Sequence, residues 1–251
     1  MPPTDPSAQW PTDPWAPARP PGHDELPYDD GEPMESPVHR RQMNLLCECA
    51  ERGIDPALAA FVGGNMGVYY TSLQAVKNDF KAPDFFVVLH AEPRERRSWV
   101  TWEEGRGPDL VVEILSPSTE KEDRGRKMRI YAEGIRVAEY FLYDPVTHAL
   151  EGYQLGGGGR GYVPMEREAD GTFRSEVTGL RLLVRPGTFQ GDTRDWLRFA
   201  YPDGSVVPTA EELARAEAAR ADSQQARADS QQARADALAA KLRALGVDPD
   251  A

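Results

Sequence analysis

The sequence predicts an α/β protein: a mixed β-sheet flanked by helices, then a C-terminal β meander and a long C-terminal helix. Seven short segments rich in β-branched and aromatic residues precede a Gly-rich turn at 156–161. A helical pattern separates two of them, and the heptad SQQARAD occurs twice from Ser223. The seven expected strands lie at 58–64, 67–72, 84–90, 98–102, 109–115, 138–144 and 150–155.

The first helix is expected from His39 to Arg52. Apolar side chains recur there with the spacing i, i+3, i+4, i+7, which places them on one helical face. Gly53 follows and is expected to cap the C-terminus. The residues of this face are Met43, Leu46, Cys47 and Ala50.

The second helix is expected from Lys121 to Glu133, between the strands at 109–115 and 138–144. Thr119 and Glu122 fit a capping box at its start, and Gly134 fits its end. A strand, a helix of this length and a second apolar strand predict a βαβ unit with parallel strands. Its inward face should carry Met128, Tyr131, Ala132 and Ile135.

Three regions follow from composition. Residues 1–26 are predicted to be a disordered acidic tail, because eleven of the twenty-two prolines lie within residues 1–37. The folded domain covers 27–205, with a meander after the hairpin turn at 156–161. Residues 206–251 form a helical, heptad-like tail starting near Thr209. An exposed helix and a coiled-coil homodimer are both open, because the heptad seam is apolar only at its C-terminal end. A homodimer could form through the core or through the C-terminal helix.

Composition also restricts location. No run of 18 or more apolar residues exists, so no membrane partner is expected. The N-terminus lacks the features of a secretory signal. Cys47 and Cys49 point to different sides of a helix and are expected to be free thiols. These observations predict a cytoplasmic protein.

The net charge of −12 is unevenly distributed. Residues 1–38 hold eight acidic residues and one arginine, whereas residues 39–150 hold fifteen basic and seventeen acidic residues. The central region is therefore almost neutral, but it has no basic patch that would predict tight non-specific DNA binding. Charge neither proves nor excludes phosphate chemistry.

Glu113 is the sharpest anomaly, since it interrupts the apolar run Val111 to Leu115. A carboxylate in a strand buried on both faces costs several kcal/mol unless a cation or a metal compensates it. One alternative is an ion pair with an arginine of the following helix: Arg124, Arg126 or Arg129. The other is that Glu113 and Asp84, on neighbouring strands, bind Mg²⁺ or Mn²⁺, which prefer carboxylate oxygens.

The helix after Glu113 supplies cations near the same strand end. Arg124 falls within the inward helical face and Lys127 on its flank. Lys127 could extend its aliphatic stem along apolar surface and bring its ammonium to the acids. A solvated surface lysine is the alternative. Asp109, which opens the strand of Glu113, fits a turn or edge residue better than a ligand.

The stretch PDLVVEILSPST, with DRGRK and EYFLYDP after it, resembles the Uma family of restriction endonucleases in the PD-(D/E)xK nuclease superfamily. DDGEPMESPVH and PDFFVVL are similar to the same family, and the likeness covers about residues 27–155. The C-terminal meander and helical tail also resemble the family. The resemblance implies a restriction-endonuclease-like mixed sheet flanked by helices.

The resemblance also implies site residues. The family's acidic pair corresponds to Asp84 and Glu113. The superfamily lysine lies two residues after the glutamate, where this chain has Leu115. Uma-type sequences move it to the next helix, which indicates Lys127. Further candidates are Glu35, with Glu48 behind it, and His39, which matches a family position but also fits a cap.

These observations predict an Mg²⁺- or Mn²⁺-dependent endonuclease that hydrolyses DNA through Asp84, Glu113 and Lys127. The main alternative is a non-catalytic interaction protein that keeps the nuclease fold and assembles through its C-terminal helix. Hydrolysis of a small phosphoester or nucleotide is a third possibility, because it needs the same metal chemistry and no basic groove.

Overall fold

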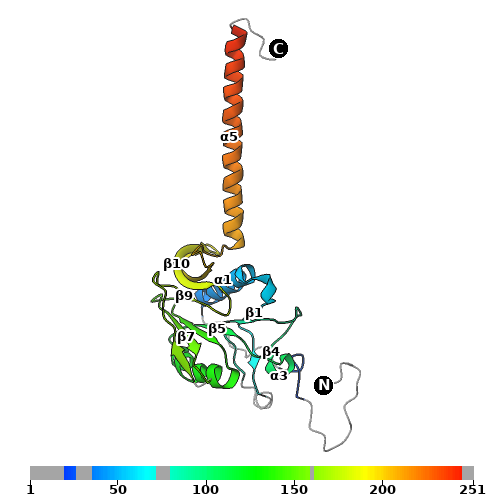
Figure 1. Ribbon diagram of the computed structural model, residues 1–251, viewed down its shortest axis with the longest axis vertical. Helices are drawn as coiled ribbons and strands as arrows, with labels where there is room; N and C mark the ends of the chain where they lie inside the picture. Colours follow the sequence, from blue (N-terminus) through cyan, green and yellow to red (C-terminus); the bar gives the residue numbers. More distant parts are fainter. Residues whose placement is uncertain (1–19, 27–35, 72–79, 159–160, 245–251) are drawn as a thin grey trace, which may run out of the picture.

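The protein is described here from a computed structural model, which places residues 20–26, 36–71, 80–158 and 161–244. A six-stranded mixed sheet forms its centre, in the order β1-β3-β5-β6-β7-β8 (Figure 1). All residues of β3, β5 and β6 are buried, which explains their nearly continuous apolar sequences. The strands are β1 (Phe61–Gly64), β3 (Phe85–Val88), β5 (Leu110–Ile114), β6 (Glu139–Tyr143), β7 (Leu150–Leu155) and β8 (Tyr162–Pro164).

The strand pairing confirms the predicted βαβ unit. β5 and β6 are parallel, and Glu113 lies opposite Leu142. β3 runs antiparallel to β5, with Phe85 opposite Val112. The seven expected strands are all present, although the segment at 98–102 gives only β4 (Trp99–Val100) before the short helix α3 (Thr101–Glu104). β4 pairs in parallel with β2 (Val68–Tyr69).

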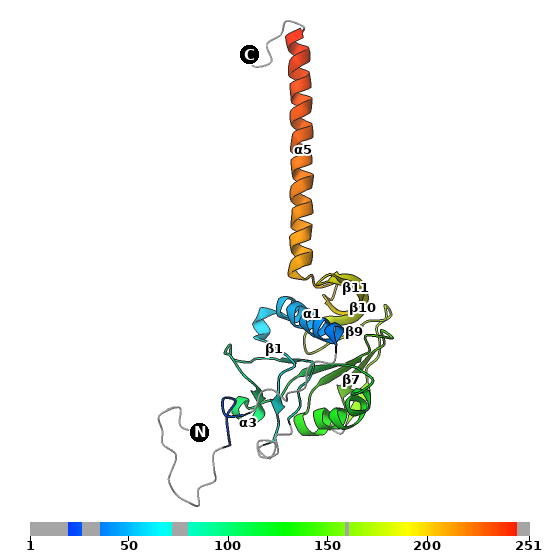
Figure 2. The same cartoon turned by 180° about the vertical axis from the view of Figure 1, so that it is seen from behind.

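One face of the sheet is covered by α1 (Pro37–Gly53) and by a second sheet, in the order β11-β10-β9 (Figure 2). These strands are β9 (Phe173–Arg174), β10 (Arg181–Phe189) and β11 (Asp192–Ala200), the predicted meander. The fully buried Gln42 of α1 donates a hydrogen bond to Leu197 O at 2.9 Å and accepts one from Leu197 N at 3.0 Å. The first helix is thereby fixed to β11.

The predicted cap of α1 is wrong. Gly53 has no left-handed backbone, and the extended Ile54 ends the helix. The glycine is needed for space, since a Cβ atom there would lie 2.8 Å from the Val207 side chain. A glycine after a helical pattern therefore marked a close packing contact with the C-terminal region rather than a turn.

The opposite face is covered by the helix between β5 and β6, seen below the sheet in Figure 2. It consists of α4 (Glu120–Glu122), the π-helical segments η2 (Asp123–Lys127) and η3 (Ile130–Ile135), and the residues between them. Tyr131 and Ala132 are buried, and Met128 and Ile135 pack against the same core cluster, as predicted.

Thr119 is the N-cap of this helix, as predicted, but neither end has the predicted cap interaction. The Thr119 side chain makes no cap hydrogen bond, and Ser116 Oγ instead accepts from Thr119 N at 3.2 Å. Gly134 lies inside η3, where a Cβ atom would lie 3.3 Å from the Tyr70 ring. The helix ends at Arg136, which has a positive φ of 67°. Packing against neighbours, rather than backbone freedom, explains this glycine too.

The C-terminal helix α5 (Ala210–Ala244) extends away from the domain as one rod (Figure 1). Its base is anchored: Glu212 N donates to Thr209 Oγ1 at 3.1 Å, and Thr209 N donates to Glu212 Oε2 at 2.8 Å. The Arg198 guanidinium lies 2.8 Å from Glu212 Oε2 and also donates to Val207 O. Farther along, Leu238 is 60% exposed, so this leucine of the heptad pattern faces solvent.

Candidate active site

Asp84 and Glu113 lie side by side because of the β3–β5 register. Asp84 immediately precedes β3, and its neighbour Phe85 lies opposite Val112. Ile114 N donates to Asp84 Oδ2 at 2.7 Å, and Asp84 N lies 3.4 Å from Glu113 Oε2 as a long hydrogen-bond donor. The backbone of each strand thus orients the acid of the other. The two predicted acids belong to one site.

Glu113 is almost completely enclosed, with a side chain that is 1% exposed. Burial raises the pKa of Glu113 to about 8, and the charges of Asp84 and Asp123 act in the same direction, whereas Lys127 lowers it. Tyr131 donates its hydroxyl proton to Glu113 Oε1 at 2.7 Å. Each carboxylate oxygen of this acid therefore has a partner, and Oε2 is the one that faces Asp84 and Lys127.

Lys127 brings its ammonium between two buried acids. Its Nζ lies 3.1 Å from Glu113 Oε2 and 2.8 Å from Asp123 Oδ1. Burial alone would lower the pKa of Lys127, but Glu113, Asp123 and Asp84 together raise it above its usual value. Its position between these acids favours the charged form of the lysine. The arrangement matches the expectation of a buried stem with the ammonium at the acids.

Asp123 belongs to this cluster and was missed in the sequence. Its side chain is 1% exposed, and burial is the main reason why the pKa of Asp123 is raised. The Tyr140 hydroxyl donates to Asp123 O at 3.0 Å, which fixes the first turn of η2 to β6. Asp123, Lys127 and Tyr131 are spaced by four residues each, and this helical repeat is the signal that could have identified the acid and the tyrosine.

The remaining candidates have different positions. His39, buried at the start of α1, has its Nε2 3.5 Å from Asp84 Oδ2, so it contacts the site. Its backbone N–H donates to Ser36 Oγ, the N-cap. Glu48 accepts from Ala210 N instead, at the base of α5. Glu35 lies outside the described residues.

Two other expectations concern charged groups near β5. Arg124 does not reach the acids, because its guanidinium pairs with Glu120 and Glu151 at 2.8 and 2.7 Å. Asp109 is a structural residue, as predicted: it accepts from Leu89 N at 2.8 Å and pairs with Arg106 at 2.7 Å. The arginine alternative for Glu113 is wrong, since its cation is Lys127.

The donor set can be compared with the needs of a divalent cation. Within the described residues, no three His, Cys, Asp or Glu side chains are arranged to hold a metal ion. Asp84 and Glu113 would therefore supply two carboxylates, and the Asp84 side chain is 18% exposed. Mg²⁺ and Mn²⁺ prefer oxygen ligands, and Mg²⁺ usually keeps several waters beside one or two carboxylates. The residues present fit such an ion.

Comparison with known proteins identifies the family of the chain. The profile of the Uma2 family, described as "Putative restriction endonuclease", matches residues 20–186, which is most of the chain. The chain belongs to the Uma2 family. The matched region contains Asp84, Glu113 and Lys127 together with the whole six-stranded sheet. The restriction-endonuclease-like α/β fold expected from the sequence is confirmed at the level of this family.

The chain is also similar to two further proteins. An uncharacterized protein of Synechocystis sp. is 38% identical over 77 residues, which cover 30% of this chain and 37% of that protein's length. A crystal structure of a "putative nuclease belonging to DUF820" from Anabaena variabilis has a TM-score of 0.40 and 16% identity. That likeness covers 56% of this chain and 75% of the Anabaena chain.

Over the ranges that are described, no helix combines the length and the apolar composition needed to cross a bilayer.

Proposed function

We propose that this Uma2 protein hydrolyses phosphodiester bonds of DNA with Mg²⁺ or Mn²⁺ held by Asp84 and Glu113. The observation that carries the proposal is the burial of Glu113 beside a second acid and a lysine, in a chain of a nuclease family. A strand core that needed only apolar packing would not contain this costly cluster. Perturbed ionisable groups of this kind gather at functional sites.

A bound divalent cation would polarise the scissile phosphodiester and lower the pKa of a water molecule. The chain's own residues prepare the site for it. The Ile114 N–H orients Asp84, and the Tyr131 hydroxyl fixes Glu113 so that Oε2 faces the neighbouring acid. Asp123 holds the Lys127 ammonium beside Glu113. This ammonium is positioned to stabilise negative charge that develops on the phosphoryl oxygens.

The experiment is a cleavage assay with the purified full chain. Supercoiled, linear and single-stranded DNA are incubated with Mg²⁺ or Mn²⁺, and with EDTA as the control. We expect metal-dependent cleavage that Asp84→Asn and Glu113→Gln abolish while circular dichroism shows a retained fold. If all three DNA substrates stay intact with either metal, the nuclease proposal is wrong.

A second function has one observation in its favour. The exposed rod α5, with Leu238 facing solvent, offers a surface for assembly into a homodimer. On this alternative the acids are only structural and the protein is a non-catalytic interaction protein. Calorimetry with Mn²⁺ separates the two, because a scaffold should show no metal binding that depends on both Asp84 and Glu113.

A further inference from the structure

A hollow of about 510 Å³ lies on the outer side of the helix that carries Lys127. The helix contributes Gly134 and four side chains, Arg126, Arg129, Ile130 and Glu133, which follow the spacing i, i+3, i+4, i+7 and so form one stripe. Tyr70, which follows β2, supplies the other wall. Since a Cβ atom at position 134 would lie 3.3 Å from the Tyr70 ring, glycine there leaves room for the tyrosine.

The hollow and the acid cluster use neighbouring faces of the same helix. Lys127 and Tyr131 point inward to Glu113, whereas Arg126 and Arg129 are exposed. Arg129 makes no ion pair with a described residue that would neutralise it. One helical turn thus presents a cation to the reaction centre and two arginines to the outside.

A chain of charges joins the two places. Glu122 Oε1 lies 3.7 Å from Arg126 Nη1 and 3.7 Å from Lys81 Nζ. Lys81 precedes Asp84 by three residues, and Glu122 immediately precedes Asp123. Ion pairs through Glu122 therefore link an arginine of the hollow to the segment that precedes Asp84.

We propose that this hollow binds a single strand of the nucleic acid to be cleaved, with phosphates at Arg126 and Arg129 and a base against Tyr70. This inference rests on the proposed nuclease function and names its substrate class. Arginines that follow a backbone, combined with an aromatic ring, are typical of single-strand binding. Duplex binding draws its affinity from many phosphate contacts, which a protein of net charge −12 with two arginines here does not offer.

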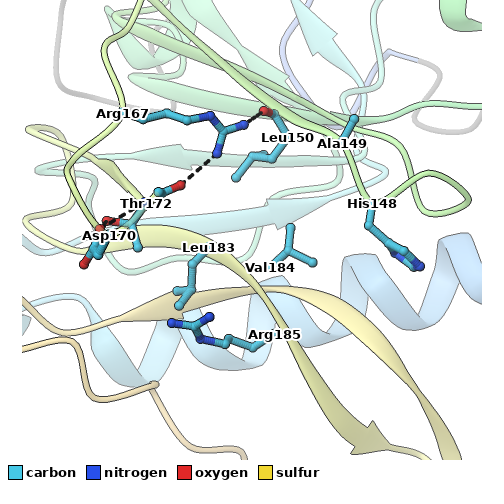
Figure 3. A pocket seen from close by; sticks show the side chains of 10 residues that line it. His148, Ala149, Leu150, Arg167, Asp170, Thr172, Leu183, Val184 and Arg185 are labelled. Atoms are coloured by element: carbon cyan, nitrogen blue, oxygen red, sulfur yellow. Dashed lines mark hydrogen bonds between the residues drawn. The ribbon is translucent and has the colours of Figure 1, made fainter.

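A second hollow, of about 260 Å³, is the alternative place for an anion (Figure 3). It lies between the start of β7, the segment at 165–172 and β10, and its rim carries Arg167 and Arg185. Arg167 donates to Leu150 O and Gly171 O, so its guanidinium is already engaged in hydrogen bonds within the domain. Arg185 is exposed, and it therefore provides a matched control.

The test is fluorescence anisotropy of a labelled oligothymidylate of about 12 nucleotides, in EDTA, with the full chain. We expect the double variant R126A/R129A to bind at least about tenfold more weakly, with a salt slope reduced by about 1.4, because each lost phosphate contact removes about 0.7. Tyr70→Ala should weaken binding about fivefold or more, whereas Tyr70→Phe should keep it. Arg185→Ala should change neither quantity, and a duplex of the same length should bind more weakly than the single strand.

The inference is overturned if the wild-type chain does not bind the oligonucleotide, if the duplex binds more tightly, or if R185A weakens binding while R126A/R129A does not. Its failure is distinguishable from failure of the nuclease proposal. If cleavage requires Asp84 but R126A/R129A binds the oligonucleotide as tightly as the wild type, the hollow is not the binding site and the nuclease proposal stands. If binding depends on Arg126, Arg129 and Tyr70 but no DNA is cleaved with metal, the hollow is a binding site and the nuclease proposal is wrong.

Discussion

The Lys127 ammonium lies 3.1 Å from Glu113 Oε2, so a helix supplies the cation of this site and the strand supplies the acid. The same ammonium lies 2.8 Å from Asp123, and Asp84 adds a third acid at the strand end. One fixed positive charge therefore faces three carboxyl groups. Burial is the largest cause of the raised pKa of Glu113, and the charges of Asp84 and Asp123 add to it. On the proposed function, a divalent cation would balance this excess of acid.

The first prediction concerns Lys127→Met. Removing the ammonium leaves Glu113 and Asp123 buried without a cation, so we expect the free energy of unfolding to fall by roughly 3 kcal/mol. Urea denaturation at pH 8 measures this loss, and the cleavage rate should fall at least about a hundredfold. Lys121→Met is the matched control, because Lys121 is exposed on the same helix. If the two variants are equally stable, Lys127 contributes no more to folding than an exposed lysine does.

The second prediction concerns Tyr131→Phe. The substitution removes the hydroxyl that donates to Glu113 Oε1 but keeps the buried ring. We expect kcat to fall about tenfold or more while KM changes little, because hydrogen bonds to charged groups contribute about 1.5–3 kcal/mol. Tyr153→Phe removes a similar bond to Glu151, away from the acids, and should leave kcat unchanged. A rise in KM alone would assign Tyr131 to substrate binding instead.

The third prediction is a pH dependence of stability in the metal-free protein. Burial raises the pKa of Glu113 from its usual 4.5 to about 8, so between these values the unfolded chain has released a proton that the folded chain retains. Its contribution to stability is complete below pH 4.5 and is lost as the pH rises towards 8. The free energy of unfolding of Glu113→Gln, relative to wild type, should therefore increase between pH 5 and pH 8. A difference that is flat over this range would contradict the raised pKa.

The fourth prediction concerns α5. Thr209 and Glu212 cap the helix, and Val207 is fully buried, so a chain ending at Tyr201 would lose part of the core. A chain ending after Arg215 keeps these contacts. We expect it to have the melting temperature of the full chain. If α5 assembles a homodimer, this shorter chain should be a monomer by light scattering, whereas the full chain should be a dimer. If both chains have the same mass in solution, α5 is not an oligomerisation element.

The sequence was sufficient for the parts of this protein that depend on local pattern. Apolar runs located β3, β5 and β6, and the cost of a buried acid singled out Glu113. The sequence could not show why positions 53 and 134 are glycines. A Cβ atom at Gly53 would collide with Val207, and one at Gly134 would crowd Tyr70. Both neighbours are distant in the chain.

Asp123 was hidden for a related reason. An acid in the first turn of a helix is expected to be solvated and to favour the helix dipole. Only the placement of this turn against β6, through the Tyr140 hydroxyl, buries it beside Lys127. Arg124 and Lys127 were both plausible as the cation from a helical wheel. Glu151, which lies on β7, pairs with Arg124 and so leaves Lys127 as the cation at the acids.

The central claim is that Asp84 and Glu113 together hold a divalent cation, and calorimetric titration with Mn²⁺ tests it most directly. The full chain is titrated at pH 8 beside Asp84→Asn, Glu113→Gln and the control Arg185→Ala. We expect saturable binding in the wild type and in R185A, and its loss in both acid variants. Binding that persists when either acid is replaced, or no binding by the wild type, would contradict it.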